Sequence, residues 1–246
     1  DLRWRLPAAI TRCAPDRAGA ILLERLVRER DGLVRYGCVQ ALERLVRRNP
    51  ELVFDRALLQ KSVESTMRHA YRYVDRRVSL QRGAAADASR RTDGFELLDQ
   101  MLRDKGANAL DRLFRLLALQ YPHEDVRQIA RGLDSDKRDV RASSIELLES
   151  IVRPPLREAV MGLVDDLPDE QRLRAGRHYP EPQGLDYDAL LLHLLDSDSA
   201  SVQTLTVHHI GELKLARFRA PLVELSKRAV ERSDLTRTLE RLEAAP

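Results

Sequence analysis

The sequence predicts an all-α protein, a right-handed α-solenoid of stacked helix pairs with a longer, irregular helical unit in its middle. An apolar residue, usually followed by Arg and then by apolar residues at helical spacing, opens residues 33–45 and recurs in 1–13, 140–151 and 202–213. Self-similarity of this kind is typical of helical repeat arrays. The composition agrees, because 43% of the residues are hydrophobic but only 4% are aromatic, which favours helices packed on helices. We therefore expect a single solenoid domain over residues 1–246.

Residues 1–50 are predicted to form regular repeats. Asp16 is a candidate cap for the second helix. Asn49 precedes Pro50 and is therefore biased away from helical backbone angles, which ends the third helix. The helices expected here span residues 2–13, 17–29 and 33–48.

Residues 51–121 depart from the two-helix period. Apolar residues at spacings of three, four and seven predict one long helix over about 55–81. The small and polar residues of 82–91 predict a linker or a frayed helix end. A further pair of helices, joined at Lys105-Gly106, is expected over 92–104 and 107–120.

Residues 122–246 are predicted to return to regular repeats and to end in C-terminal helices. Pro154-Pro155 ends one helix sharply. The longest predicted loop covers residues 165–187, which contain three Pro and two Gly. The expected helices span about 124–133, 138–152, 156–164, 187–195, 199–213, 218–231 and 234–243.

One Arg recurs at the start of the repeated helices, as Arg3, Arg35 and Arg141. We expect it to reach an Asp beside a neighbouring turn, such as Asp31 or Asp136, and to help fix the stacking register. The predicted inward stripe of helix 33–48 comprises Val34, Cys38, Ala41, Leu42 and Leu45.

Charge and cysteine content narrow the function classes only slightly. The net charge is +3, from 42 basic and 39 acidic residues, which is too small an excess to indicate nucleic acid. Cys13 and Cys38 lie at apolar helix positions, where a thiol behaves as a small hydrophobe, and their number indicates a reducing compartment.

The sequence contains no run of about 18 apolar residues, so no membrane span is predicted. The chain begins inside a repeat motif, so we expect a fragment of a longer protein.

The entry Asp-x-x-Val-Arg at residues 31–35, followed by Ala-Leu-x-x-Leu at 41–45, resembles HEAT repeats, an armadillo-type fold. A narrower similarity covers about residues 30–166. There, the order of Leu113 to Pro122, Gly132 to Ser135 and Arg141 to Glu149 resembles the soluble helical region of bacterial ATP:ADP translocase-related transporters of the major facilitator type. This resemblance implies a cytoplasmic HEAT-repeat domain linked to a nucleotide-transporter-like membrane protein. Transport chemistry would lie in membrane segments that this chain lacks, so no transport residue is carried over.

An arginine-rich stretch is the best candidate for a contact surface. Arg68, Arg72 and Arg76 lie four residues apart, and Arg77 lies beside them. On a helix they form a basic ridge next to an apolar stripe, which suits an acidic protein or domain, an anionic membrane face or, less well, nucleic acid. The alternative is an ordinary solvated helix face.

The sequence contains no recognisable enzyme signature, and we predict no catalytic, cofactor-binding or metal-binding residues. Adjacent His208 and His209 point about 100° apart on a helix, and His209 is expected to face inward in a structural role. His123-Glu124 is a single pair at a helix start, and the acidic residues around the longest loop lack calcium-loop spacing. The predicted function is a non-enzymatic interaction or regulatory scaffold. The alternative is a nucleic-acid-binding HEAT-like protein that uses the Arg-rich helix.

Overall fold

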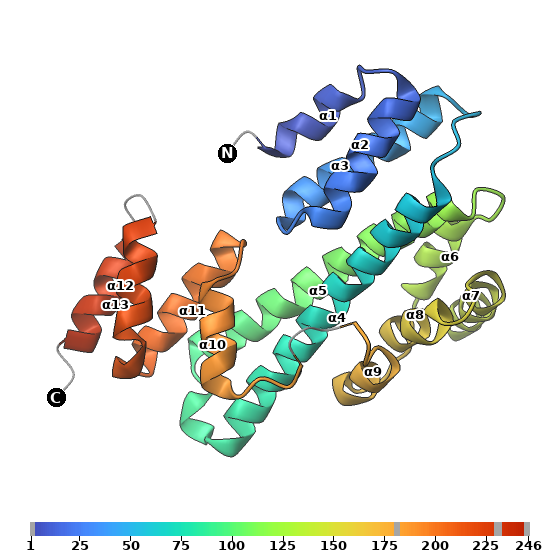
Figure 1. The fold of residues 1–246 in the computed structure, drawn as a ribbon. Coiled ribbons are helices and arrows are strands. Elements are labelled where there is room, and N and C mark those ends of the chain that lie inside the picture. Colours follow the sequence, from blue (N-terminus) through green and yellow to red (C-terminus); the bar gives the residue numbers. More distant parts are fainter. Residues whose placement is uncertain (1–2, 180–182, 229–232, 244–246) are drawn as a thin grey trace. The chain divides into compact units, whose positions relative to one another are not determined.

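The structure is a computed structural model that describes residues 3–179, 183–228 and 233–243. These residues form thirteen α-helices and three short 3-10 helices, with no strand among them, so the all-α prediction is confirmed (Figure 1). Contacts within the chain group into two compact units. Unit 1 comprises residues 1–72 and 106–181, and unit 2 comprises residues 73–105 and 182–246.

Unit 1 is built largely from helices that pack on a neighbour in sequence. α2 packs on α3, α6 on α7, and α8 on α9, while α1 lies against α3. The elements that lie wholly in this unit are η1 (Arg3–Arg5), α1 (Leu6–Ile10), α2 (Pro15–Arg28), α3 (Gly32–Arg48), α6 (Val126–Leu133), α7 (Arg138–Ile151), α8 (Leu156–Val164) and α9 (Asp169–Ala175).

Unit 2 has its own apolar core. Within it, α10 packs on α11, and α13 packs on both α11 and α12. Its buried side chains include Leu80, Phe95, Leu98 and Leu190. The elements that lie wholly in this unit are η2 (Ala88–Arg90), α10 (Tyr187–Leu195), α11 (Ala200–Glu212), η3 (Ala216–Phe218), α12 (Arg219–Arg228) and α13 (Ser233–Glu243).

Two long helices, α4 (Arg56–Ala86) and α5 (Asp93–Gln120), contribute to both units. The prediction of separate helices over 92–104 and 107–120 is wrong, because α5 continues through Lys105-Gly106. A single Gly inside a helix costs only about 1 kcal/mol relative to Ala. Buried Leu102 and Ala109 lie seven residues apart on either side of it, on one helix face, so packing holds the helix together there.

The predicted linker at 82–91 is also largely wrong. α4 continues to Ala86, and Ala88–Arg90 form the 3-10 helix η2. Gly83 and Ala84 are both buried, and a Cβ at Gly83 would lie 2.2 Å from Cδ2 of Tyr187. In the sequence, these small side chains suggested a flexible segment. In the structure, they allow the Tyr187 ring to lie directly against the helix backbone.

Local signals set most other helix boundaries correctly. The Asp31 carboxylate accepts hydrogen bonds from the backbone N–H groups of Leu33 and Val34, which caps α3, and α3 ends before Asn49 as predicted. Asp16 is not the cap of α2, however. The helix begins at Pro15, which suits the first helical position, and Asp16 lies in its first turn.

The N-terminal helix and the long loop also differ from expectation. The helix predicted over 2–13 is shorter, since η1 is followed by the five-residue α1, in which Pro7 lies near the start. The loop predicted over 165–187 contains α9, whose first turn carries two acidic residues that favour a helix N-terminus. Residues 229–231 of the helix predicted over 218–231 lie outside the described residues. The solenoid arrangement, the single domain and its regular and irregular segments stay predictions.

Two of the recurrent arginines, Arg35 and Arg141, reach the C-terminal ends of helices, and the pairing of Arg3 and Arg35 with aspartates stays a prediction. Arg35 is fully buried, and its guanidinium donates to the carbonyl oxygens of Leu26 at 2.5 Å and Glu29 at 2.9 Å, at the C-terminal end of α2. Arg141 donates to the carbonyl oxygen of Val164 at 3.1 Å, the last residue of α8. Helix C-termini expose unpaired carbonyl groups, so both arginines satisfy helix ends. The predicted inward stripe of α3 is confirmed, with every member buried.

Candidate functional site

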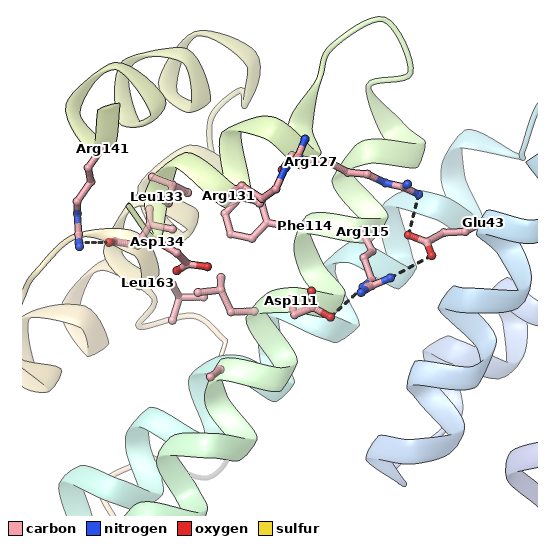
Figure 2. A pocket seen from close by; sticks show the side chains of 14 residues that line it. Glu43, Asp111, Phe114, Arg115, Arg127, Arg131, Leu133, Asp134, Arg141 and Leu163 are labelled. Carbon is pink, nitrogen blue, oxygen red and sulfur yellow. Dashed lines mark hydrogen bonds and ion pairs between the residues drawn. The ribbon is translucent and has the colours of Figure 1, made fainter. Parts of the chain in front are cut away.

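An arginine-lined groove of about 700 Å³ lies in unit 1 (Figure 2). Its walls come from α3, α5, α6, α7 and α8, which are far apart in sequence. We call it the arginine groove. Its lining residues are Glu43, Ala107, Leu110, Asp111, Phe114, Arg115, Arg127, Ala130, Arg131, Leu133, Asp134, Arg141, Leu163 and Val164.

Glu43 organises one end of this groove. It follows Leu42 on α3, and its side chain is only 8% exposed. Its two carboxylate oxygens accept from different arginines, Oε2 from Nη1 of Arg115 at 3.1 Å and Oε1 from Nη2 of Arg127 at 3.0 Å. Figure 2 shows both guanidinium groups converging on this carboxylate. A buried carboxylate is stable only when its oxygens are paired, so Glu43 and the two arginines fix one another.

Arg115 is held by a second carboxylate. Its Nε donates to Oδ2 of Asp111 at 2.8 Å, one turn earlier on α5. Its guanidinium also lies 5.4 Å from the centre of the Tyr36 ring. Partial burial disfavours the charged form of Arg115, but the hydrogen bond to Asp111 and the charges of Asp111 and Glu43 outweigh it and raise its pKa. Arg115 is therefore a rigid, permanently charged part of the wall.

Arg131 differs from the other arginines of the groove. Its side chain is exposed, and its Nε makes one long hydrogen bond, 3.4 Å, to the carbonyl oxygen of Arg127. Within the part of the chain that the structure describes, no carboxylate pairs with it. Arg127 lies one turn away on the same face of α6, so two positive charges adjoin. Arg131 is thus the guanidinium most available to a ligand.

Apolar side chains form the rest of the groove. Phe114, Leu133 and Leu163 are each 7% exposed, and Val164 is 9% exposed. The lining includes four arginines against three carboxylates, Asp134 being the third. The groove is therefore amphipathic, with an apolar wall, a small positive excess and two arginines, Arg131 and Arg141, that pair with no carboxylate among the described residues; of these two, Arg131 is the exposed one. Such a site suits a ligand that offers carboxylates together with apolar groups.

The predicted contact residues of α4 fall in both units. Arg68 and Arg72 belong to unit 1, and Arg76 and Arg77 belong to unit 2. Arg68 is exposed and lies 3.9 Å from Glu64, a weak surface pair. Arg72 is half-buried. These two arginines do not line the arginine groove.

In unit 2, Arg77 is engaged within the fold. Its Nε donates to Oδ1 of Asp99 at 3.0 Å, and Gln81 donates to the same oxygen at 2.8 Å. The Asp99 side chain is only 8% exposed, so this pair links α4 to α5. Arg76 lies 5.9 Å from the centre of the Tyr73 ring. The proposed partner-binding role of the four arginines stays a prediction, and Arg77 already has a structural role.

His209 has the structural position expected from the sequence. It is fully buried, and its Nε2 and Nδ1 lie 2.5 Å from the Tyr187 hydroxyl and 3.0 Å from the Thr92 hydroxyl. His208 lies outside this cluster and pairs with Glu212 at 3.1 Å.

Within the described ranges, no three His, Cys, Asp or Glu side chains are grouped to hold a metal ion. Likewise, no described helix is both long and apolar enough to cross a membrane.

Sequence reasoning missed the arginine groove because its charged residues are dispersed. Arg115, Arg127, Arg131 and Arg141 form no local cluster, and only the fold brings them to one cavity. One signal was present. Glu43 lies inside the apolar motif between Leu42 and Leu45, and a carboxylate at such a position requires buried positive partners.

Comparison with known proteins adds no further identification. No protein-family model, no curated protein sequence and no solved structure matches this chain at a significant level.

Proposed function

We propose that this protein is a non-enzymatic interaction module, and that the arginine groove of unit 1 binds an acidic, partly apolar segment of a partner protein. The observation that supports this most strongly is Arg131. It is exposed at the groove without a carboxylate partner among the described residues, beside a largely buried apolar wall. A partner carboxylate would complete the charge pairing of the groove.

The fixed arginines favour binding by reducing its entropic cost. Arg115 and Arg127 are held in place by Glu43 before any ligand arrives. A preorganised site loses less side-chain freedom on binding. The Arg127 side chain is 56% exposed, so it also presents part of its guanidinium to a ligand.

The charge balance favours a protein segment over nucleic acid. Phosphate backbones bind surfaces on which positive charge is in clear excess. Here Glu43, Asp111 and Asp134 lie among the four arginines and oppose a polyphosphate. A peptide combines a few carboxylates with apolar side chains and so matches the mixed lining.

Binding to a defined acidic peptide tests the proposal. The probe is a fluorescein-labelled amphipathic peptide of about 16 residues, with Glu on one face and Leu on the other, measured by fluorescence anisotropy. We expect a Kd on the order of 10 μM at about 50 mM salt, weakening as salt rises. Arg131→Glu is expected to weaken binding at least about tenfold, because it replaces attraction with repulsion.

The matched control is Arg17→Glu, which makes the same charge change at an exposed position of α2 outside the groove. It is expected to leave the affinity within about twofold. Equal weakening by both variants would show that binding follows net charge and would overturn the proposal. Tight binding of duplex DNA with a steep salt dependence, without peptide binding, would support the nucleic-acid alternative instead.

Attachment to a transporter-like membrane protein is a separate proposal, and it rests on the resemblance of residues 30–166. Its test is the complete reading frame. Upstream apolar segments of about 20 residues would support it, and a frame without them would contradict it.

A further inference from the structure

Helix α7 leaves most of its apolar stripe uncovered. Of its residues, only Ser144 and Leu148 are buried. Val140 is 42% exposed and Leu147 is 53% exposed, and Ile151 lies one further turn along. The spacing of residues 140, 144, 147 and 151 places them on one helix face, so an apolar strip runs along the side of α7.

This strip lines a second cavity of about 700 Å³ between α6 and α7 of unit 1, which are neighbouring helices in Figure 1. We call it the α6–α7 groove. Ile129 of α6, 5% exposed, contributes a further apolar wall. The helices approach closely at Gly132, where a Cβ would lie 2.0 Å from Oγ of Ser144. That hydroxyl donates to the carbonyl oxygen of Val140 at 2.8 Å, so the floor presents little unpaired polarity.

The rim of the α6–α7 groove is acidic. Glu124, Asp125 and Asp139 line it, against the single positive charge of Arg131. Asp125 caps α6 by accepting from the backbone N–H of Gln128 at 2.9 Å. Glu124 and Asp139 are exposed, and neither forms an ion pair with another described residue. Their charges therefore remain available to a partner.

We propose that the α6–α7 groove binds an amphipathic helix of a partner protein, one that carries an apolar stripe flanked by Lys or Arg. The eleven-residue step from Val140 to Ile151 corresponds to about 16 Å along a helix axis. This length matches about three turns of a docked helix, which would bury its i, i+3, i+4 and i+7 side chains against the strip.

Charge complementarity decides the kind of occupant. An apolar strip alone would accept many amphipathic segments. The excess of carboxylates on the rim selects for basic flanks and repels acidic ones. The arginine groove favours the opposite charge, so the two grooves on either side of α6 are expected to take different segments.

The test uses the full chain and two labelled helical peptides of about 16 residues that share a Leu stripe and differ only in Lys or Glu flanks. We expect the Lys peptide to bind the α6–α7 groove, with Leu147→Gln and Asp139→Lys each weakening it at least about fivefold. Both substituted side chains are exposed, so neither change is expected to unfold unit 1.

Matched controls repeat each chemical change elsewhere in unit 1. Leu33, 72% exposed on α3, receives Leu33→Gln, and exposed Glu24 of α2 receives Glu24→Lys. These variants are expected to bind the Lys peptide as the unchanged protein does. Equal loss in variant and control would overturn the proposal.

Two further measurements distinguish other occupants. Sedimentation at rising protein concentration measures whether the chain self-associates. Self-association that Leu147→Gln abolishes would overturn the proposal, because a second copy of the chain would then occupy the strip. Neither Leu147 nor Asp139 lines the arginine groove, so binding of the acidic peptide is expected to survive both changes. The two proposals can therefore fail independently.

Discussion

Acidification is expected to destabilise unit 2 through His209. The imidazole is fully buried, and each ring nitrogen has a hydroxyl neighbour. Thr92 donates its own hydrogen to Glu212, so Nδ1–H of His209 donates to Thr92, and Nε2 accepts from the Tyr187 hydroxyl. Both nitrogens are satisfied only when the ring is neutral.

The pKa gives the magnitude of this effect. Burial lowers the pKa of His209 from 6.5 to about 4. In the unfolded chain the ring takes up a proton near pH 6.5, whereas in the folded protein it stays neutral down to about pH 4. The stabilisation that neutral His209 contributes is therefore fully present above about pH 6.5. As pH decreases from 6.5 to about 4, the free energy of unfolding falls by about 1.4 kcal/mol per pH unit, which is about 3 kcal/mol in all.

Urea unfolding followed by circular dichroism, between about pH 7.5 and 4.5, measures this loss. The variant His209→Gln keeps a donor and an acceptor but does not titrate. Its free energy of unfolding is expected to be lower than that of the unchanged protein at pH 7.5, and to fall by about 2 to 3 kcal/mol less on acidification. Hydrogen exchange of α10 and α11 locates the effect in unit 2.

His123→Gln is the control, because His123 is exposed. It is expected to reproduce the pH dependence of the unchanged protein. The reasoning is refuted if His209→Gln and His123→Gln lose stability equally between pH 6.5 and 4.5, or if the NMR signal of His209 titrates near pH 6.5.

Three further predictions concern unit 1. Arg35→Ala leaves the carbonyl groups at the end of α2 unpaired and is expected to lower the free energy of unfolding by about 3 kcal/mol in urea titrations, with Arg35→Lys recovering only part of it. Gly176→Ala places a Cβ 2.0 Å from the ring of buried Tyr71 and is expected to cost about 2 kcal/mol in the same assay; a neutral result would contradict the packing. Cys13 is exposed, whereas burial raises the pKa of Cys38 to about 11, so a thiol reagent at pH 8 should modify Cys13 in minutes and Cys38 only on unfolding.

Helix content and most helix ends were predictable because their signals are local. Asp31 caps α3, and the helix before Pro154-Pro155 ends within one residue of its predicted limit. The failures at Gly106 and Gly83 have a different origin. Each glycine weakens a helix locally, but buried neighbours on the same helix and the Tyr187 ring supply packing that a local pattern does not contain.

The candidate sites were harder to predict than the helices. The inward position of His209 followed from periodicity and is confirmed. The carbonyl partners of Arg35 were not predicted from the sequence. A sequence shows which aspartates lie near turns, but it does not show which carbonyl groups at a helix end lie beside an arginine. The arginine groove depends on side chains from five helices, and their convergence is a property of the tertiary structure.

Under the proposed function, the single carboxylate of Glu43 is also expected to limit which ligands the arginine groove accepts. It neutralises charge that Arg115 and Arg127 would otherwise present together with Arg131. Replacing it with glutamine would leave Arg127 and Arg131 without a carboxylate partner and Arg115 with Asp111 alone, so the affinity of the groove for polyanions is expected to rise. Stronger heparin retention by Glu43→Gln than by the unchanged chain would show that this buried carboxylate limits the binding of polyanions to the groove.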